Sequence, residues 1–357
     1  LLVAIITVLS FSLSAKDIKL TETTNQFVIT SKSLSEFTFV SHLSEISTMR
    51  VKKDANEFIK LIVGGYGENA KKGNAELPVL EELINVPFGS TVAIKILDKE
   101  ETIISLSDYG IDNLIFPSQP SLSKSENSED VPFYFNDEYY NYDGFYTNDL
   151  VTTELLGKMR GQQLARLSVA PFSYNPTTNE LKIVTKLEVK IIFKNIDSEG
   201  HKTNKQKYYS AEFNNLFKEC INYIPSQEKD VITTYPVKYV IISDPAFHSA
   251  IQPLVEWKTK KGFMVVEGYT NDPAVGSTTA SIHNYLKNMY DNATVVDPAP
   301  TYLLIVGDDA QVPSFSGNSG SHISDMYYCE FDGGGDFYPE MYYGRFSATN
   351  PSEVEVQ

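Results

Sequence analysis

The hydrophobic pattern of the chain changes near residue 237, and this change constrains the fold more than any other feature. Before about residue 200, apolar and polar residues alternate in stretches such as LKIVTKLEVKIIF (181–193). Strict alternation is typical of antiparallel strands with one solvated face. From residue 237 onward, apolar runs such as VKYVIIS (237–243) are separated by helical patterns such as PAFHSAIQPLVEWKTKKG (245–262). We therefore predict a β-rich, sandwich-like region followed by an α/β region with a mainly parallel sheet.

The chain is predicted to contain four segments. The first, LLVAIITVLSFSLSA (1–15), has the apolar run and small final residues of a signal peptide, although a buried strand would have a similar composition. It has neither an initiating Met nor a basic start, so we expect this signal peptide to be incomplete. We expect the β-rich region at 18–200, a linker with the processing region at 201–236, and the α/β region, truncated at its C-terminus, at 237–357.

Length and charge limit the cellular location and the partners. No stretch after the signal-like segment is long and apolar enough to cross a bilayer. The sequence therefore predicts an exported protein, secreted or at the cell surface, with no transmembrane segment in the mature chain. The 357 residues carry a net charge of −16, which argues against nucleic acid as a partner because phosphate binding requires a basic surface.

Cysteine and histidine give no case for zinc or for a disulfide-rich fold. The chain has 2 Cys, Cys220 and Cys329, and neither a CxxC nor an HExxH pattern. A single bridge between the two cysteines is one interpretation. A catalytic pair of His322 with Cys329 is another, because a dyad needs proximity in space rather than in sequence. Structural roles are favoured for both cysteines, and for His248 and His283, which lie in predicted helices.

Two carboxylates follow the third apolar run of the α/β region. In TYLLIVGDDAQVPSF (301–315), the run ends at Gly307 and leads directly into Asp308 and Asp309. The carboxyl ends of parallel strands are where α/β proteins place their sites. A catalytic role, a metal-binding role and a helix-capping role are all compatible with this position.

A second acidic segment, FDGGGDFYPE (331–340), combines glycines with Asp332, Asp336 and Glu340. Carboxylate and carbonyl oxygens are the ligands that Ca²⁺ takes, in sets of about six to eight. The spacing is not that of an EF-hand, and a solvated acidic turn is the alternative. If this loop returns past Asp308, the two acidic sets predict a calcium ion that ties the strand end to the loop.

Several longer stretches resemble peptidase family C25, the gingipain-type peptidases. PTYLLIVGDDAQVPSF, SHISDMYYCEFDGGGDFYPEMYYGRFSATNPSE and PAFHSAIQPLVEWKTKKG are similar to the first half of the catalytic domain. Upstream, GNAELPVLEELINVPFGSTVAIKI, MRGQQLARLSVAPFSYNP and LEVKIIF are similar to the prodomain. The resemblance covers nearly the whole chain after the signal-like segment, in the expected order.

The resemblance implies a caspase-like α/β fold and a secreted cysteine endopeptidase that acts on protein and peptide substrates. The family uses a His–Cys dyad whose histidine stands in a Gly-His-Gly context. This chain contains no Gly-His-Gly, so the resemblance places both dyad members beyond Gln357 and no catalytic residue within the chain.

The resemblance also implies a latent zymogen, in which the enzyme's own prodomain is an intramolecular inhibitor until it is cleaved off. The segment SQEKDVITT (226–234) is the predicted cleavage region. Lys158 and Arg160 are alternatives for a residue that blocks the cleft, although structural roles are favoured for both.

A calcium site is a further implication of the resemblance. Matching the family position by position gives Asp308, Asp336 and Glu340 as carboxylate ligands, with backbone carbonyls from Gly333 and Tyr338. Ca²⁺ is therefore the predicted structural cofactor.

Two other functions stay open. A sortase-like transpeptidase that processes exported surface proteins would keep the family's nucleophile and change its acceptor. A non-catalytic, calcium-stabilised surface or adhesion protein would have lost the dyad. A Gly-His-Gly and a downstream Cys beyond Gln357 would indicate an enzyme, and a cleavage assay with an added amine nucleophile would separate the two reactions.

Overall fold

The computed structural model describes residues 16–53, 56–68, 70–124, 131–146, 148–225, 236–294, 296–317, 322–333 and 336–357. The predicted signal peptide and the predicted cleavage region lie outside the described residues. The chain divides into two compact units. Unit 1 comprises Leu1–Glu82, Val92–Glu154 and Arg166–Ile192, and unit 2 comprises Leu83–Thr91, Leu155–Ala165 and Phe193–Gln357. Among the described residues, the structure contains no helix with the length and apolarity needed to span a membrane.

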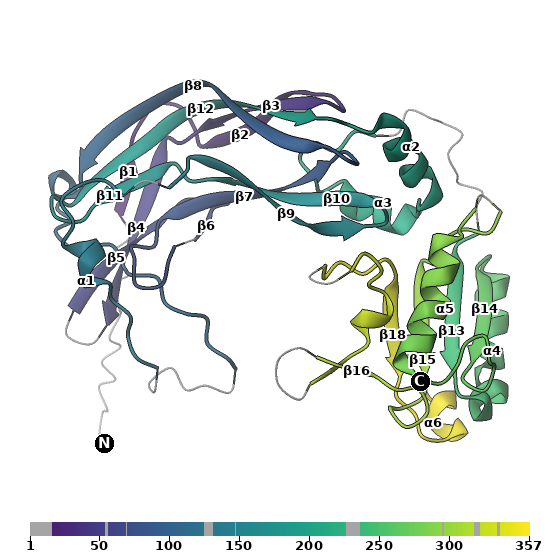
Figure 1. Cartoon of the computed structure of the whole chain (residues 1–357). Helices are drawn as coiled ribbons and strands as arrows, with labels where there is room; N and C mark the ends of the chain where they lie inside the picture. Colours follow the sequence, from purple (N-terminus) through teal and green to yellow (C-terminus); the bar gives the residue numbers. More distant parts are fainter. Residues whose placement is uncertain are drawn as a thin grey trace, which may run out of the picture. The chain divides into compact units, whose positions relative to one another are not determined.

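The region before residue 195 is β-rich, as the alternating pattern predicts (Figure 1). One sheet has the order β11 (Phe172–Asn175), β12 (Glu180–Lys194), β3 (Glu36–His42) and β2 (Gln26–Lys32), and β8 (Thr91–Ser105) also pairs with β12. A second sheet has the order β1 (Lys16–Lys19), β4 (Glu45–Lys53) and β5 (Asn56–Ile62). A third has the order β6 (Gly67–Glu68), β7 (Pro78–Val86), β10 (Gln162–Val169) and β9 (Val151–Met159). The helical elements of this region are η1 (Leu106–Tyr109) and α1 (Asp137–Tyr140).

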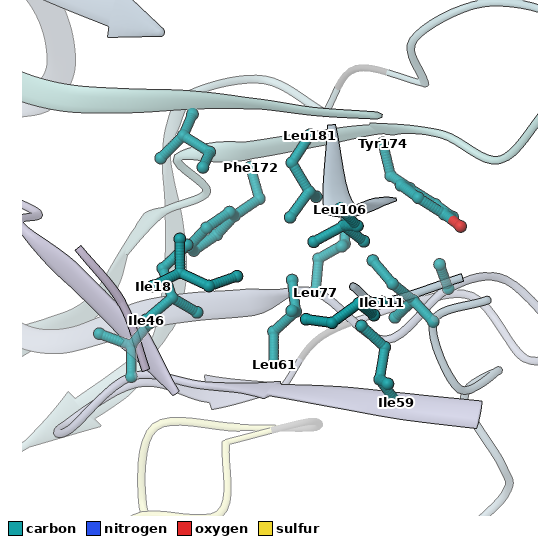
Figure 2. Packing of buried hydrophobic residues seen from close by; sticks show 14 of the residues in the cluster. Ile18, Ile46, Ile59, Leu61, Leu77, Leu106, Ile111, Phe172, Tyr174 and Leu181 are labelled. Atoms are coloured by element: carbon teal, nitrogen blue, oxygen red, sulfur yellow. The ribbon is translucent and has the colours of Figure 1, made fainter. Parts of the chain in front are cut away.

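The core of unit 1 lies between two of these sheets. Figure 2 shows side chains of β1, β4 and β5 facing side chains of β11 and β12. Alternate residues of each strand point into this layer, because successive side chains of a strand lie on opposite faces. Two sheets packed face to face form the predicted sandwich-like arrangement. The facing residues include Ile18, Ile46, Ile59, Leu61, Phe172, Tyr174 and Leu181, all of them buried.

Unit 2 contains the predicted parallel sheet. The strands β14 (Met264–Tyr269), β13 (Lys238–Ser243), β15 (Tyr302–Val306) and β18 (Tyr342–Phe346) lie in this order and all run parallel. Both faces of the sheet are covered, which explains why the apolar runs do not alternate with polar residues. Val240 and Ile242 pack on one face of β13, whereas Ile241 packs on the other.

Helices cover the two faces of this sheet (Figure 1). α4 (His248–Lys260), the preceding η2 (Pro245–Phe247) and α6 (Pro351–Glu355) pack on the side of Ile241. α5 (Thr279–Asp291) and η3 (Met326–Tyr328) pack on the side of Ile242. α5 begins at a capping box, in which the Thr278 side chain accepts the backbone N–H of Ser281. A short hairpin, β16 (Phe315–Ser316) and β17 (Ile323–Ser324), follows the β15 strand end.

Unit 2 also contains part of the β-rich region. The tip of the β9–β10 hairpin, Leu155–Ala165, belongs to it, together with α2 (Ser198–Lys207) and α3 (Ala211–Phe217). Met159 and Leu164 of the hairpin pack with Phe213, Phe217 and Cys220 in one buried cluster. Both helices lie almost entirely in the stretch 201–236, which the sequence predicted to be a linker.

Candidate metal centre

The strand-end residue Asp308 lies at the carboxyl edge of the parallel sheet. Its backbone N–H donates to the Ala348 carbonyl at 2.9 Å, and its Oδ1 accepts the Ser347 hydroxyl at 3.1 Å. The neighbouring Asp309 accepts the Ser314 backbone N–H at 2.7 Å and so holds the loop after β15. Asp309 therefore stabilises this loop by accepting a backbone N–H within it.

Glu340, another of the predicted ligands, lies at the opposite edge. Glu340 precedes β18, and the N–H of Tyr342 donates to the carbonyl of Thr301, which precedes β15. Because β15 and β18 are parallel, residues before them mark the amino edge and residues after them mark the carboxyl edge. Each strand rises about 3.3 Å per residue, so the strand length separates the two edges. The structure therefore does not bring the predicted ligands Asp308 and Glu340 together.

Glu340 is the most unusual acidic residue of this loop. It is 1% exposed, and its Oε2 accepts the backbone N–H of Phe331 at 3.3 Å. Its Oε1 has no hydrogen-bond partner among the described residues, although it is buried. Burial, together with the nearby Asp332 carboxylate, raises the pKa of Glu340 to about 9. A buried carboxylate with an unpaired oxygen is expected to gain a proton or a cation.

Two further carboxylates lie near Glu340. The Asp332 carboxylate is within hydrogen-bonding reach of the Glu340 carboxylate, and Asp336 is close enough to contribute to its raised pKa. The Oδ1 of Asp336 accepts the Tyr338 N–H at 3.0 Å, and its Oδ2 accepts the Lys158 N–H at 2.7 Å. Asp332, which the position-by-position match left out of the ligand set, is therefore a better partner for Glu340 than Asp308.

The donor set fits a hard cation better than a soft one. Asp332, Asp336 and Glu340 supply only oxygen, as Ca²⁺ and Mg²⁺ prefer. The unpaired, buried Oε1 of Glu340 is the feature that a cation would satisfy. Among the residues that the structure describes, no three His, Cys, Asp or Glu side chains converge closely enough to hold a metal ion. A cation would therefore require the aspartates to turn towards Glu340.

Arg160, at the tip of the β9–β10 hairpin, lies beside the same loop. It is 2% exposed, and burial lowers its pKa. Its guanidinium also lies over the rings of Phe213 and Tyr290, at 5.3 and 5.5 Å. Arginine stays protonated in proteins, so the buried charge needs many acceptors. These are backbone carbonyls: Tyr208 accepts from Nε at 2.8 Å, Pro300 and Glu340 from Nη1 at 2.6 and 3.1 Å, and Tyr209 from Nη2 at 3.3 Å.

A second arginine organises the carboxyl edge. Arg345 of β18 forms a bidentate pair with Asp325, with nitrogen–oxygen distances of 2.8 and 2.7 Å. Its Nη1 donates to the carbonyls of Gly307 and Val312, each at 2.8 Å. No role was assigned to Arg345 from the sequence, in which none of these partners is adjacent to it.

The cysteines and helical histidines have structural surroundings. Cys220 and Cys329 are free and buried. Burial raises the pKa of Cys220 to about 12 and raises that of Cys329 well above its ordinary value, so neither thiol is a ready nucleophile. The Nε2 of His283 is hydrogen-bonded to the Glu330 carbonyl at 2.9 Å. These surroundings favour the structural roles over a His322–Cys329 pair.

Comparison with known proteins identifies the sequence family that this chain matches. The sequence model of peptidase family C25 matches residues 232–357, and that of the C25 propeptide matches residues 24–220. Lys-gingipain of Porphyromonas gingivalis is 31% identical over 344 residues, which are 96% of this chain and 20% of the relative. Gingipain R2 of the same species is 26% identical over 317 residues, 82% of this chain and 40% of the relative. The chain thus spans about a fifth of the length of Lys-gingipain.

Solved structures also match. One, described as giving structural insight into zymogenic latency of gingipain K from Porphyromonas gingivalis, has a TM-score of 0.49 at 31% identity and covers 50% of this chain and 98% of that chain. Another, a complex of the pro- and mature domains of Porphyromonas gingivalis RgpB, has a TM-score of 0.45 at 20% identity and covers 56% of this chain and 98% of that chain.

The propeptide match alone covers more than half of the chain, and the peptidase match follows it in the order that the sequence motifs indicated. The chain belongs to peptidase family C25 and includes the family's propeptide.

Proposed function

We propose that this chain is the propeptide-bearing part of a secreted cysteine endopeptidase that is made as a latent zymogen. The main support is the position of Arg160. This residue belongs to the segment matched by the propeptide, yet two of its carbonyl acceptors, Pro300 and Glu340, belong to the segment matched by the peptidase. A propeptide that inhibits must stay bound when the connecting chain is cut. A buried, charge-assisted arginine gives it such an anchor.

The reaction proposed for the complete protein is attack of a cysteine thiolate on a peptide carbonyl, with a histidine as the general base. The residues described here do not supply that nucleophile, since burial keeps Cys220 and Cys329 as thiols at neutral pH. Both dyad members are therefore proposed to lie beyond Gln357, with protein and peptide chains as substrates.

The position of the hairpin bears on how latency would work. Arg160 and Lys158 lie at the amino edge of the parallel sheet, whereas α/β proteins place their sites at the carboxyl edge. This arrangement favours anchoring as the role of Arg160, rather than insertion into a catalytic cleft.

We also propose that the peptidase segment holds a structural Ca²⁺. Asp332, Asp336 and Glu340 are the carboxylate ligands in this proposal, with the carbonyls of Gly333 and Tyr338 as further oxygen donors. The support is the buried, unpaired Oε1 of Glu340 and its carboxylate neighbours. The ion would take the place of the proton that the buried Glu340 carboxyl otherwise holds, and it would give Oε1 the partner that it lacks.

The test of the enzymatic proposal uses the complete protein after removal of the propeptide. Peptide cleavage that iodoacetamide abolishes supports a cysteine endopeptidase. Transfer of the acyl group to an added amine, in place of hydrolysis, would instead indicate the transpeptidase. A protein without thiol-dependent turnover, but with calcium-dependent stability, would be the non-catalytic surface protein.

A further inference from the structure

The tip of the β9–β10 hairpin contacts the carboxylates of the proposed calcium site. The backbone N–H of Lys158 donates to Oδ2 of Asp336 at 2.7 Å, and the Lys158 ammonium lies 3.7 Å from Oδ1 of Asp332. Lys158 belongs to the propeptide match, and both aspartates belong to the peptidase match. The hairpin therefore supplies a donor and a positive charge to two of the three proposed carboxylate ligands.

Gly157 shows how closely the hairpin backbone lies on this loop. A Cβ at this position would lie 2.5 Å from Oδ1 of Asp336 and 2.7 Å from Cδ2 of Tyr338. Any other residue would push the hairpin away from the loop. The hairpin backbone therefore packs against Asp336, the same side chain that a cation would bind.

The carboxylates of Glu340 and Asp336 have different partners. Glu340 faces Asp332 with a buried, unpaired oxygen, whereas both Asp336 oxygens accept N–H groups. A bound Ca²⁺ requires its oxygens within about 2.3–2.6 Å, so the carboxylates must converge. With the hairpin seated, no three acidic side chains of the described residues do so.

We propose that the hairpin tip and a divalent cation compete for the carboxylates of Asp332 and Asp336, so that calcium binding loosens the propeptide at this contact. This inference rests on the calcium site proposed above. The positive charge of the Lys158 ammonium repels a divalent cation. When the carboxylates converge on a cation beside Glu340, Asp336 moves away from the Lys158 N–H. By linkage, the factor by which the hairpin weakens calcium affinity is also the factor by which calcium weakens the hairpin.

Isothermal titration of CaCl₂ into the metal-free, full 357-residue chain measures the coupling. We expect Lys158→Met to tighten calcium binding by about threefold to tenfold, since one partly exposed charge is removed. Lys158→Arg keeps the charge and should return the affinity to that of the unchanged chain. Lys260→Met is the matched control, because Lys260 lies on α4, 71% exposed, and pairs with Glu256.

Hydrogen exchange of the hairpin provides the reciprocal measurement. Calcium should speed exchange of the Lys158 amide, whose acceptor is Asp336. In Glu340→Gln, which cannot complete the site, calcium should leave that exchange rate unchanged.

The outcomes separate the two proposals. One outcome is that calcium binding is lost in Glu340→Gln but is equal in Lys158→Met and the unchanged chain, while calcium does not speed exchange at Lys158. That outcome supports the calcium site and overturns the competition. No calcium binding by any of these chains overturns the site and the competition together. Tighter binding in Lys158→Met, with faster Lys158 exchange in calcium, supports both.

Discussion

Arg160 donates a hydrogen bond at 3.1 Å to the backbone carbonyl of Glu340, the residue whose carboxylate is buried in the acidic loop. One residue thus presents its main chain to the hairpin anchor and its side chain to the candidate metal centre. The hairpin anchor and the acidic loop therefore cannot move independently at Glu340.

Replacing Arg160 by Met should destabilise unit 2 by about 2 to 4 kcal/mol, because buried carbonyls lose a charged donor without access to water. Urea unfolding of the full chain measures the change. Arg166→Met is the control, since Arg166 is 40% exposed and its nearest carboxylate oxygen is 3.5 Å away. Equal stability of the two variants would show that Arg160 is not an anchor.

Removal of calcium should lower the melting temperature of the chain, and added calcium should restore it. A ligand at about 100 times its Kd stabilises the folded state by roughly 2.7 kcal/mol. Glu340→Gln and Asp336→Asn should abolish this response, whereas Asp308→Asn should keep it, because Asp308 lies at the other edge of the sheet. A melting curve that EDTA leaves unchanged would exclude the site.

His201 should make unit 2 less stable in acid. Its Nδ1 accepts the Phe88 N–H at 3.4 Å, and burial, together with Lys205, lowers its pKa below the ordinary 6.5. The folded state therefore binds fewer protons than the unfolded state. This stability is present above pH 6.5 and is lost as the pH falls from 6.5 through the lower pKa of the folded state. Urea unfolding at pH 7.5 and 5.5 checks this.

His201→Asn should reduce the difference between the two pH values, because asparagine keeps an acceptor and does not titrate. His248→Asn, at the start of α4, is the comparison and should leave the difference in place. A pH dependence that is the same in all three chains would assign the effect to other groups.

The two cysteines should resist thiol reagents in the folded chain. Burial raises both pKa values, so the thiolate fraction at neutral pH is very small. We expect negligible labelling by Ellman's reagent under native conditions and labelling of both cysteines in guanidinium. Rapid native labelling of Cys329 would revive its pairing with His322.

Local signals made much of the fold predictable. The apolar runs of β13 and β15 lie where the sequence indicates them. Such features depend on neighbours within a few positions. By contrast, α2 was missed because it has no buried residue and therefore no apolar stripe, although Asp197 caps its start.

The site was less predictable because it depends on topology. The sequence contains Asp308 and Glu340 as similar acidic residues near apolar strands, but only the parallel pairing of β15 and β18 assigns them to opposite edges. Arg160 is a similar case. Its acceptors are main-chain carbonyls, which every residue has, so no sequence pattern marks them.

The hydrogen bonds of Arg160 have a consequence for how this contact changes during evolution. All four acceptors are main-chain oxygens, and substitutions at Tyr208, Tyr209, Pro300 and Glu340 replace side chains without removing those oxygens. The hydrogen bonding of Arg160 is therefore tolerant of side-chain substitution at these four positions. Related propeptides with the same arginine could dock on peptidases whose side chains have diverged, provided that the backbone path is kept.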